Sequence, residues 1–185
     1  KMGFALAEAC AGRGAEVTLV TGPVCLQTSH PCIHRVDVET AAEMANQAQL
    51  YFQQADAGIL CAAVADFTPE TTAGYKIKRE KDDLTLRLKP TQDIAAMLGQ
   101  FKTSKQKLIG FALETNDEQH NAQSKLERKN FDFIVLNSLN DSGAGFRYDT
   151  NKISIIDRQG HTDYPLKSKS EVAQDIINRL VEELQ

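Results

Sequence analysis

Residues 57–67 read Ala-Gly-Ile-Leu-Cys-Ala-Ala-Val-Ala-Asp-Phe, and this stretch decides how the chain is expected to fold. Its short apolar run, Ala57 to Ala62, is typical of a buried strand. Small residues then continue to Asp66, where the strand pattern stops. Small side chains at the carboxyl end of a strand let a flat ligand lie against the backbone, and open α/β sheets bind ligands at that edge. The stretch therefore predicts an α/β fold with a ligand site after this strand.

A basic segment, Lys76-Ile77-Lys78-Arg79, follows within one connection. In an extended backbone Lys76 and Lys78 point to the same side. Such a segment is usually a solvated charged strand, but beside a strand end it could instead hold a triphosphate and offset charge during phosphoryl transfer. Asp66 also has two readings, a turn or cap residue or an acceptor for a nucleobase amino group or a ribose hydroxyl.

Strand and helix signals alternate along the rest of the chain. The helices are expected at 2–13, 40–54, 93–101, 117–129 and 168–184, and the main strands at 16–20, 33–38, 57–62, 107–113 and 131–136. Thr40 and Glu43 have the spacing of a capping box, and Ser168 or Ser170 should begin the last helix. Strands separated by helices predict a Rossmann-like, mainly parallel sheet with helices on both faces.

Three segments break this alternation. The connection 66–88 is long enough to be functional, and the alternating residues 84–88 predict an antiparallel strand on a protruding arm. Residues 137–150 predict a flexible loop containing Gly143 and Gly145. Segments 152–157 and 159–164 predict an antiparallel hairpin near the carboxyl terminus.

Composition narrows the function classes. The 185 residues fit one domain, and a 42% hydrophobic content can form a core. The formal charge of -4 argues against general nucleic-acid binding. There is no long apolar run and no signal peptide, so no membrane segment is expected. The four cysteines lack CxxC spacing, which favours reduced thiols in a cytoplasmic protein. The four histidines show no metal spacing, so metal ligands stay unassigned.

Further candidates for the site lie downstream. Lys125 and Lys129 are four apart on one helix face, either as surface charges or as a second pair of cations facing the same phosphates. Phe111 ends a buried strand and is expected in the core more than as a ligand platform. Gly110 beside it would permit close approach of a ligand to the backbone.

Six stretches together resemble phosphopantothenoylcysteine synthetase, the synthetase domain of the bifunctional coenzyme A biosynthesis flavoprotein of bacteria. They are Lys-Met-Gly-Phe-Ala-Leu-Ala (1–7), Gly-Ala-Glu-Val-Thr-Leu-Val-Thr-Gly-Pro (14–23), Ala-Ala-Val-Ala-Asp-Phe (62–67), Lys-Ile-Lys-Arg (76–79), Gly-Phe-Ala-Leu-Glu-Thr (110–115) and Lys-Asn-Phe-Asp-Phe-Ile-Val-Leu-Asn (129–137). The resemblance covers nearly the whole chain in the family's order. It implies a single nucleotide-binding synthetase domain at 1–185, with the family's first strand, its Gly-rich loop and an asparagine that acts on the acyl-nucleotide expected before Lys1.

The resemblance implies a ligase that joins 4'-phosphopantothenate to L-cysteine through an acyl-cytidylate. CTP and Mg²⁺ would be used, and pyrophosphate and CMP released. CTP is favoured over ATP because the motif form is bacterial. Family members are dimers in which the arm reaches across, and a decarboxylase domain carrying FMN can be fused upstream.

The resemblance also assigns residues. Lys76 would be the lysine needed for acyl-nucleotide formation. The nucleotide pocket would comprise Leu60, Cys61, Ala62, Asp66, Lys76, Lys89, Asp93, Phe111, Lys125 and Lys129. The chain departs from the family at Lys89-Pro90-Thr91-Gln92-Asp93, where the family has Asn-Pro-Asp, and at Arg79, where the family has lysine.

Two other hypotheses remain. A nicotinamide-dependent reductase should have an acid closing the second strand, but that strand ends Val20-Thr21-Gly22-Pro23, and no Tyr-x-x-x-Lys pair is present. A non-catalytic nucleotide-binding dimer module would bind CTP without releasing pyrophosphate.

Overall fold

The computed structural model describes residues 1–79, 83–114, 118–138 and 148–185. Its helices are α1 (Met2–Ala11), α2 (Ala41–Phe52), α3 (Ile94–Phe101), α4 (Glu118–Arg128) and α5 (Lys169–Leu184). Its strands are β1 (Val17–Thr21), β2 (Ile33–Asp37), β3 (Ala57–Leu60), β4 (Phe67–Pro69), β5 (Leu88–Pro90), β6 (Lys107–Glu114), β7 (Phe133–Ser138), β8 (Thr150–Asn151), β9 (Ile153–Ile156), β10 (His161–Asp163) and β11 (Lys167–Ser168).

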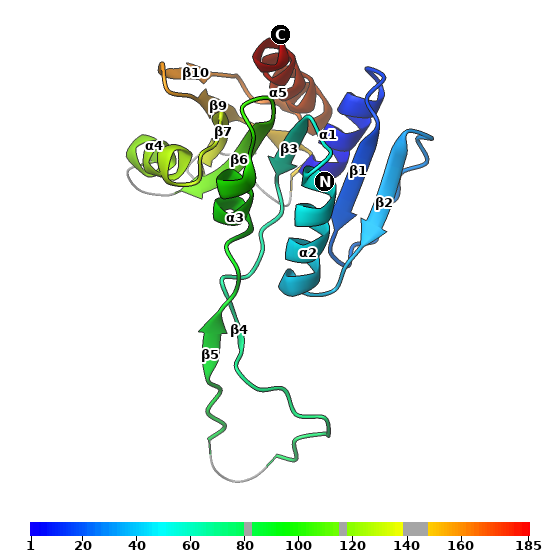
Figure 1. The fold of residues 1–185 in the computed structure, drawn as a ribbon, viewed down its shortest axis with the longest axis vertical. Helices are drawn as coiled ribbons and strands as arrows, with labels where there is room; N and C mark the ends of the chain where they lie inside the picture. Colours follow the sequence, from blue (N-terminus) through cyan, green and yellow to red (C-terminus); the bar gives the residue numbers. More distant parts are fainter. Residues whose placement is uncertain (80–82, 115–117, 139–147) are drawn as a thin grey trace.

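The central sheet has the strand order β10-β9-β7-β6-β3 (Figure 1). Strands β3, β6 and β7 are parallel, whereas β9 runs antiparallel to β7 and β10 antiparallel to β9. The predicted α/β class, the mainly parallel sheet and the carboxyl-terminal hairpin are therefore confirmed.

The strand that opened the sequence argument is shorter and more exposed than expected. It ends at Leu60, and all four of its residues are partly exposed. The physical reason is its place in the sheet, because among the described residues β3 pairs with β6 alone. Strands β1 and β2 form a separate parallel pair, in which β1 likewise has one partner.

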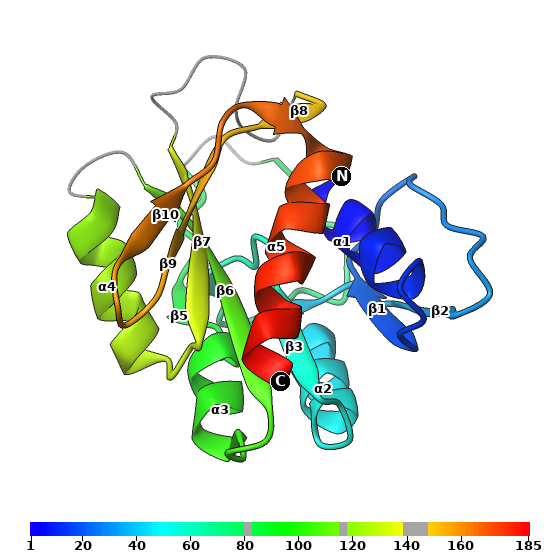
Figure 2. The same cartoon turned by 90° about the horizontal axis from the view of Figure 1, so that it is seen from above.

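Helices cover both faces of the central sheet, as Figure 2 shows from above. One core cluster joins α1 and α5 to Ile109, Phe133 and Val135 of the sheet. The other joins α2, α3 and α4 to residues of the opposite parity, such as Leu108 and Ile134. This period of two along β6 and β7 is what a strand buried on both faces requires.

Two of the predicted helix starts are fixed by capping boxes. Thr40 and Ser168 each accept a hydrogen bond from the backbone N–H three residues on, and the glutamate at that position reaches back to the cap. Helix α4 is described from Glu118, so the expected start at Asp117 lies outside the described residues.

The long connection after Asp66 forms an arm that projects from the body (Figure 1). Its base is the antiparallel pair β4–β5, with Phe67 opposite Pro90. The prediction of a strand at 84–88 is wrong, because only Leu88 of that range lies in a strand. Leu84 and Leu86 are exposed, so their alternation does not bury a hydrophobic face that would stabilise a strand there.

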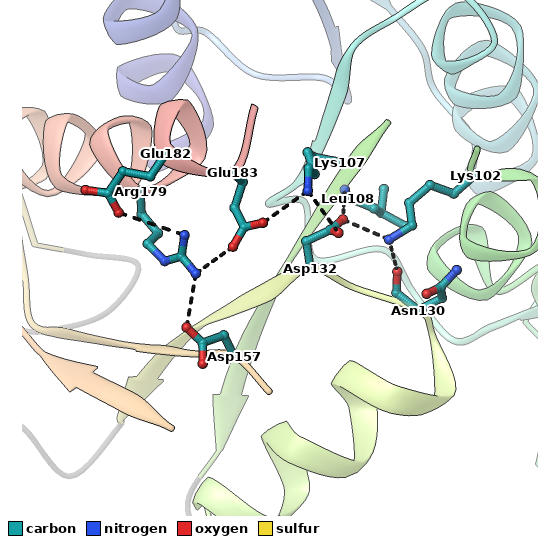
Figure 3. Close-up of polar contacts among 9 residues, drawn as sticks. All are labelled: Lys102, Lys107, Leu108, Asn130, Asp132, Asp157, Arg179, Glu182 and Glu183. Atoms are coloured by element: carbon teal, nitrogen blue, oxygen red, sulfur yellow. Dashed lines mark hydrogen bonds and ion pairs between the residues drawn. The ribbon is translucent and has the colours of Figure 1, made fainter. Parts of the chain in front are cut away.

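A chain of ion pairs lies at the amino-terminal ends of β6 and β7 (Figure 3). Asp132 accepts hydrogen bonds from the Lys102 ammonium at 2.8 Å and the Leu108 N–H at 2.6 Å. Lys107 pairs with Glu183 at 3.1 Å, and Arg179 pairs with Glu183 at 2.6 Å. Arg179 also pairs with Asp157 at 3.1 Å. The network fastens the end of α5 to the edge of the sheet opposite the one where a ligand is expected.

The segment after β7 was predicted to be a flexible loop. Residues 139–147, including Gly143 and Gly145, lie outside the described residues. The short pair β8–β11, which the sequence analysis did not predict, follows it. None of the helices formed by the described residues has the length and apolar character needed to cross a membrane.

Candidate nucleotide site

Leu60, Cys61 and Ala62 lie at and just beyond the carboxyl end of β3, where the ligand was expected. Leu60 and Cys61 are half-buried, and Ala62 is exposed. Burial raises the pKa of the Cys61 thiol to about 11, although nearby cations, Lys169 among them, oppose the rise. The thiol is therefore protonated at neutral pH and suited to lining a pocket rather than to nucleophilic attack.

Thr91 fixes the chain where it leaves this strand end. Its backbone N–H donates to the carbonyl of Asp66 at 2.9 Å, and its hydroxyl donates to the carbonyl of Ala65 at 2.6 Å. Asp66 itself is exposed, with its carboxylate at the base of the arm. Thr91 is one of the positions where the chain departs from the family pattern. In the structure its two hydrogen bonds join the arm to the sheet edge.

Asp93 and Lys129 are brought together by the fold. Asp93 is the N-cap of α3 and accepts from the Ala96 N–H at 3.0 Å. Its carboxylate pairs with the Lys129 ammonium at 3.1 Å. Partial burial raises the pKa of Asp93, but the hydrogen bond from Ala96 and the Lys129 charge outweigh it, so the net pKa is lowered. The pair places an ionised carboxylate and a lysine next to the start of α3.

The position of Lys129 depends on a close contact between α3 and the end of α4. A Cβ on Gly99 would lie 2.1 Å from the Lys129 carbonyl oxygen, so only glycine fits. Asn130 adopts a positive φ of 53° and donates to the Gly99 carbonyl at 2.9 Å. Lys125 lies one turn earlier, half-buried on α4, and its carbonyl accepts from the Lys129 N–H.

Phe111 is partly buried and packs against the core cluster on the α1–α5 face. The expectation that Gly110 leaves room for a ligand is wrong. A Cβ on Gly110 would lie 2.5 Å from the Phe131 ring, so this aromatic side chain occupies the space.

Lys76 and Lys89 are both exposed, and both lie on the arm. Lys89 stands opposite Thr68 in the β4–β5 pair. Among the described residues, no hydrogen bond or ion pair joins Lys76 to the sheet edge. The physical reason is the arm, which extends away from the body of its own chain (Figure 1).

Sequence reasoning missed a buried polar group at the same edge of the sheet. Lys169 and Asn151 are 8% and 1% exposed. Lys169 donates to the Tyr148 carbonyl at 2.6 Å. Asn151 donates to Asn137 Oδ1 at 3.0 Å, while its own Oδ1 is buried and has no hydrogen-bond partner among the residues that the structure describes. The one available signal was a lysine at the first position of a helix, where the helix dipole disfavours a cation.

A surface hollow lies elsewhere, beside the carboxyl ends of β1 and β2. Pro23, Arg35, Asp37 and Glu43 are among its lining residues. Arg35 is already paired with Asp37 at 2.7 Å and donates to the Leu26 carbonyl at 2.6 Å. The remaining charges are acidic, so this hollow does not suit a polyphosphate.

Comparison with known proteins identifies the family. Residues 1–184 match the family described as the DNA/pantothenate metabolism flavoprotein C-terminal domain. The chain belongs to this family.

Two curated relatives match nearly the whole chain but are about twice its length. A protein of an unknown prokaryotic organism, named cysteine/cysteine sulfinic acid decarboxylase, is 55% identical over 98% of the chain and 51% of its own length. The coenzyme A biosynthesis bifunctional protein CoaBC of Bacillus subtilis is 42% identical over 97% of the chain and 44% of its own length. The chain thus spans about half the length of the curated relatives it matches.

Solved structures agree with this family assignment. A crystal structure of the C-terminal domain of CoaBC is 34% identical, has a TM-score of 0.82, and is covered to 82% by 99% of this chain. A Cab2 mutant in complex with phosphopantothenate-cysteine is 18% identical with a TM-score of 0.62, over 82% of this chain and 54% of that one. The latter likeness is one of fold.

Proposed function

We propose that the natural protein carrying this chain is a phosphopantothenate–cysteine ligase that uses CTP and acts in coenzyme A biosynthesis. The observation that carries the proposal is the family match over residues 1–184. The bacterial relatives named for coenzyme A biosynthesis and the structural likeness to the CoaBC C-terminal domain support it. The name of the decarboxylase relative is not carried over, because half of that protein lies outside the match.

The proposed reaction has two steps. A carboxylate oxygen of 4'-phosphopantothenate attacks the α-phosphorus of CTP, so a new P–O bond forms, the α–β phosphoanhydride breaks and pyrophosphate leaves. The amine of cysteine then attacks the acyl carbon, the acyl–phosphate bond breaks and CMP leaves, with the amine proton released to solvent. The first step brings a carboxylate to a polyanion, so cations must lower the repulsion between them.

The residues at the sheet edge supply both parts of such a site. Leu60, Cys61, Ala62 and Asp66 would line the nucleoside beyond β3. Lys125 and Lys129 would face the phosphates, with Asp93 and Phe111 beside them. Asp93 pairs with Lys129 at 3.1 Å, so phosphate oxygens would have to compete with that carboxylate.

Mg²⁺ would accompany the nucleotide. Within the described ranges no three His, Cys, Asp or Glu side chains converge on a metal-sized site. This fits an ion that is bound mainly by phosphate oxygens and water, with one or two carboxylates at most. Asp66 and Asp93 are the carboxylates that the proposed nucleotide pocket itself contains.

The arm extends away from the body with Lys76 beyond its base and Lys89 at its base, in β5, which supports a dimer in which each arm completes the partner's site. The one-sided pairing of β1 and β3 supports a further parallel strand between them, followed by the Gly-rich loop and its asparagine. The bifunctional relatives support a decarboxylase domain, with FMN, in the same natural protein.

The test is pyrophosphate release by the natural protein with 4'-phosphopantothenate, Mg²⁺ and either CTP or ATP. Wild type should be compared with Lys76→Ala and with Arg87→Ala, an exposed cation on the same arm outside the basic segment, as the matched control. We expect CTP-dependent release that Lys76→Ala abolishes and Arg87→Ala largely retains. Release with ATP alone would overturn the choice of nucleotide. CTP binding without release by the wild type would favour the non-catalytic module.

A further inference from the structure

A buried lysine at the ligand-binding edge is not used by the reaction described above. Lys169 is the first residue of α5, directly after the N-cap Ser168, and it is 8% exposed. Its N–H donates to the Asp149 carbonyl at 2.8 Å, and its ammonium donates to the Tyr148 carbonyl at 2.6 Å. Both bonds hold the two residues that precede β8.

Lys169 connects parts of the chain that are far apart in sequence. Asp149 forms an ion pair with the Lys1 side chain at 2.7 Å, and Lys1 leads directly into α1. Figure 2 shows this end of the chain beside the first turn of α5 and close to β8. The charges of Lys169 and Cys61 also influence each other, which places the ammonium near the end of β3. The lysine thus sits where α1, β3, β8 and α5 come together.

The charge of Lys169 is held against opposing effects. Burial and repulsion from Lys1 lower the pKa of Lys169, and they outweigh the charges of Asp149 and Cys61, which raise it. The start of a helix also carries partial positive charge, which opposes a cation there. Charged groups held against such penalties are typical of functional sites.

We propose that Lys169 is a positioning residue of the ligase site: its ammonium holds the Tyr148 carbonyl, and so fixes the neighbouring Asp149, whose ion pair holds the Lys1 end of α1 beside the end of β3. The inference rests on the proposed function. Loss of this linkage would displace the pocket wall at Cys61 and weaken nucleotide binding, while the phosphate-facing lysines on the other helices would remain in place.

The experiment measures pyrophosphate release by the natural protein as CTP is varied, for wild type, Lys169→Met, Lys169→Arg and Lys167→Met. Lys167 is the matched control, because it lies two residues before Lys169 and its ammonium is bound to Asp175 of α5 at 2.7 Å. For Lys169→Met we expect KM for CTP to rise roughly tenfold, because the wall of the pocket at Cys61 is no longer held in place. We expect kcat per folded molecule to stay within about twofold. Lys169→Arg should restore most of the affinity, and Lys167→Met should match wild type.

A merely structural lysine would lower the amount of folded enzyme, and so the apparent kcat, without moving KM. That result in Lys169→Met, or no rescue by arginine, would overturn the inference. Should Lys169→Met fail to fold, Asp149→Asn decides, since the Asp149 side chain is 88% exposed and its loss breaks the ion pair with Lys1. An unchanged KM in that variant would also overturn it. If the wild type released no pyrophosphate, that result would instead contradict the proposed function, and this inference would fail with it.

Discussion

At the scale of single residues, Asp93 caps α3 and pairs with Lys129, and the two tasks can be separated. Asparagine can still cap a helix but carries no charge, whereas alanine does neither. We predict that Asp93→Ala lowers the free energy of unfolding by about 1 kcal/mol and Asp93→Asn by only a few tenths. Urea unfolding at neutral pH measures both. Equal losses in the two variants would show that the ion pair, and not the cap, stabilises this end of α3.

The same carboxylate gives a pH dependence whose sign follows from its lowered pKa. Its contribution to stability is present above the ordinary value of about 4 and is lost as the pH falls through the lower folded-state pKa. The stability of Asp93→Asn should therefore fall less steeply than that of wild type in acid. Parallel curves for the two proteins would contradict this.

Cys61 offers a second test at this scale. Because burial raises its pKa to about 11, roughly one thiol in a thousand is ionised at pH 8. Cys25 and Cys32 are exposed. We predict that iodoacetamide at pH 8 modifies Cys25 and Cys32 well before Cys61, as read by peptide mass spectrometry. Early modification of Cys61 would mean that the end of β3 is open to solvent.

At the scale of elements, the contact between α3 and the end of α4 positions Lys129. A methyl group on Gly99 would collide with the Lys129 carbonyl at 2.1 Å, so the two segments must separate. We predict that Gly99→Ala lowers the free energy of unfolding by about 2 kcal/mol and raises KM for CTP.

Gly3→Ala is the control for this substitution. Gly3 also lies in a helix, but a Cβ there meets nothing within 4 Å. Because alanine favours the helix, this variant should gain about 0.5 to 1 kcal/mol. Thermal unfolding of the two variants in parallel measures the difference. Similar shifts in both would show that helix propensity, and not the contact with Lys129, decides the cost at Gly99.

The sequence predicted these elements well where one physical signal was strong. The Thr40–Glu43 spacing gave one helix start, and Ser168 was one of two serines expected to begin the last helix. The two-sided burial of β6 and β7 appeared as continuous apolar runs. The prediction of a strand at 84–88 was wrong because its alternating leucines are exposed on the arm, where no packing stabilises a strand. Short pairs such as β8–β11 depend on tertiary contacts and leave almost no local pattern.

The candidate site was predictable only in part for a related reason. Strand ends and paired lysines can be read along the chain, but ion pairs between distant segments cannot. Asp93 and Lys129 are brought together by the close packing at Gly99, and Lys169 meets Asp149 through the β8–β11 pair. Lys76, assigned to the same pocket from the resemblance, lies far out on the arm of its own chain.

At the scale of the whole molecule, the ion-pair network in Figure 3 fastens the last helix to the sheet. Removing Asp132 would leave the Lys102 ammonium and the Leu108 N–H, both buried, without this acceptor. We predict that Asp132→Ala costs about 3 kcal/mol in urea unfolding. Glu182→Ala, at the 69% exposed rim of the network, should change stability by less than about 0.5 kcal/mol. A small effect at Asp132 would mean that water replaces the carboxylate.

Because Lys76 lies on the projecting arm, it can serve either the site of its own chain or the site of a partner subunit. If arms are exchanged in a dimer, each site combines the body of one subunit with the arm of the other. A heterodimer of Lys76→Ala and Lys129→Ala subunits, isolated with two different tags, then contains one site with both defects and one with neither. We predict that it releases pyrophosphate at roughly half the wild-type rate, although each homodimer is inactive.

The opposite arrangement gives a different result. If each arm folded back onto its own body, every site in the heterodimer would carry one defect, and the mixture would be as inactive as its parents. Lys76 would then have to reach the sheet edge by a movement of the arm about the β4–β5 base. That movement would break the hydrogen bonds from Thr91 to Ala65 and Asp66, which hold the arm in its present direction. Because both bonds are short and Thr91 leads directly to the cap of α3, we expect the exchange between subunits to be the arrangement found.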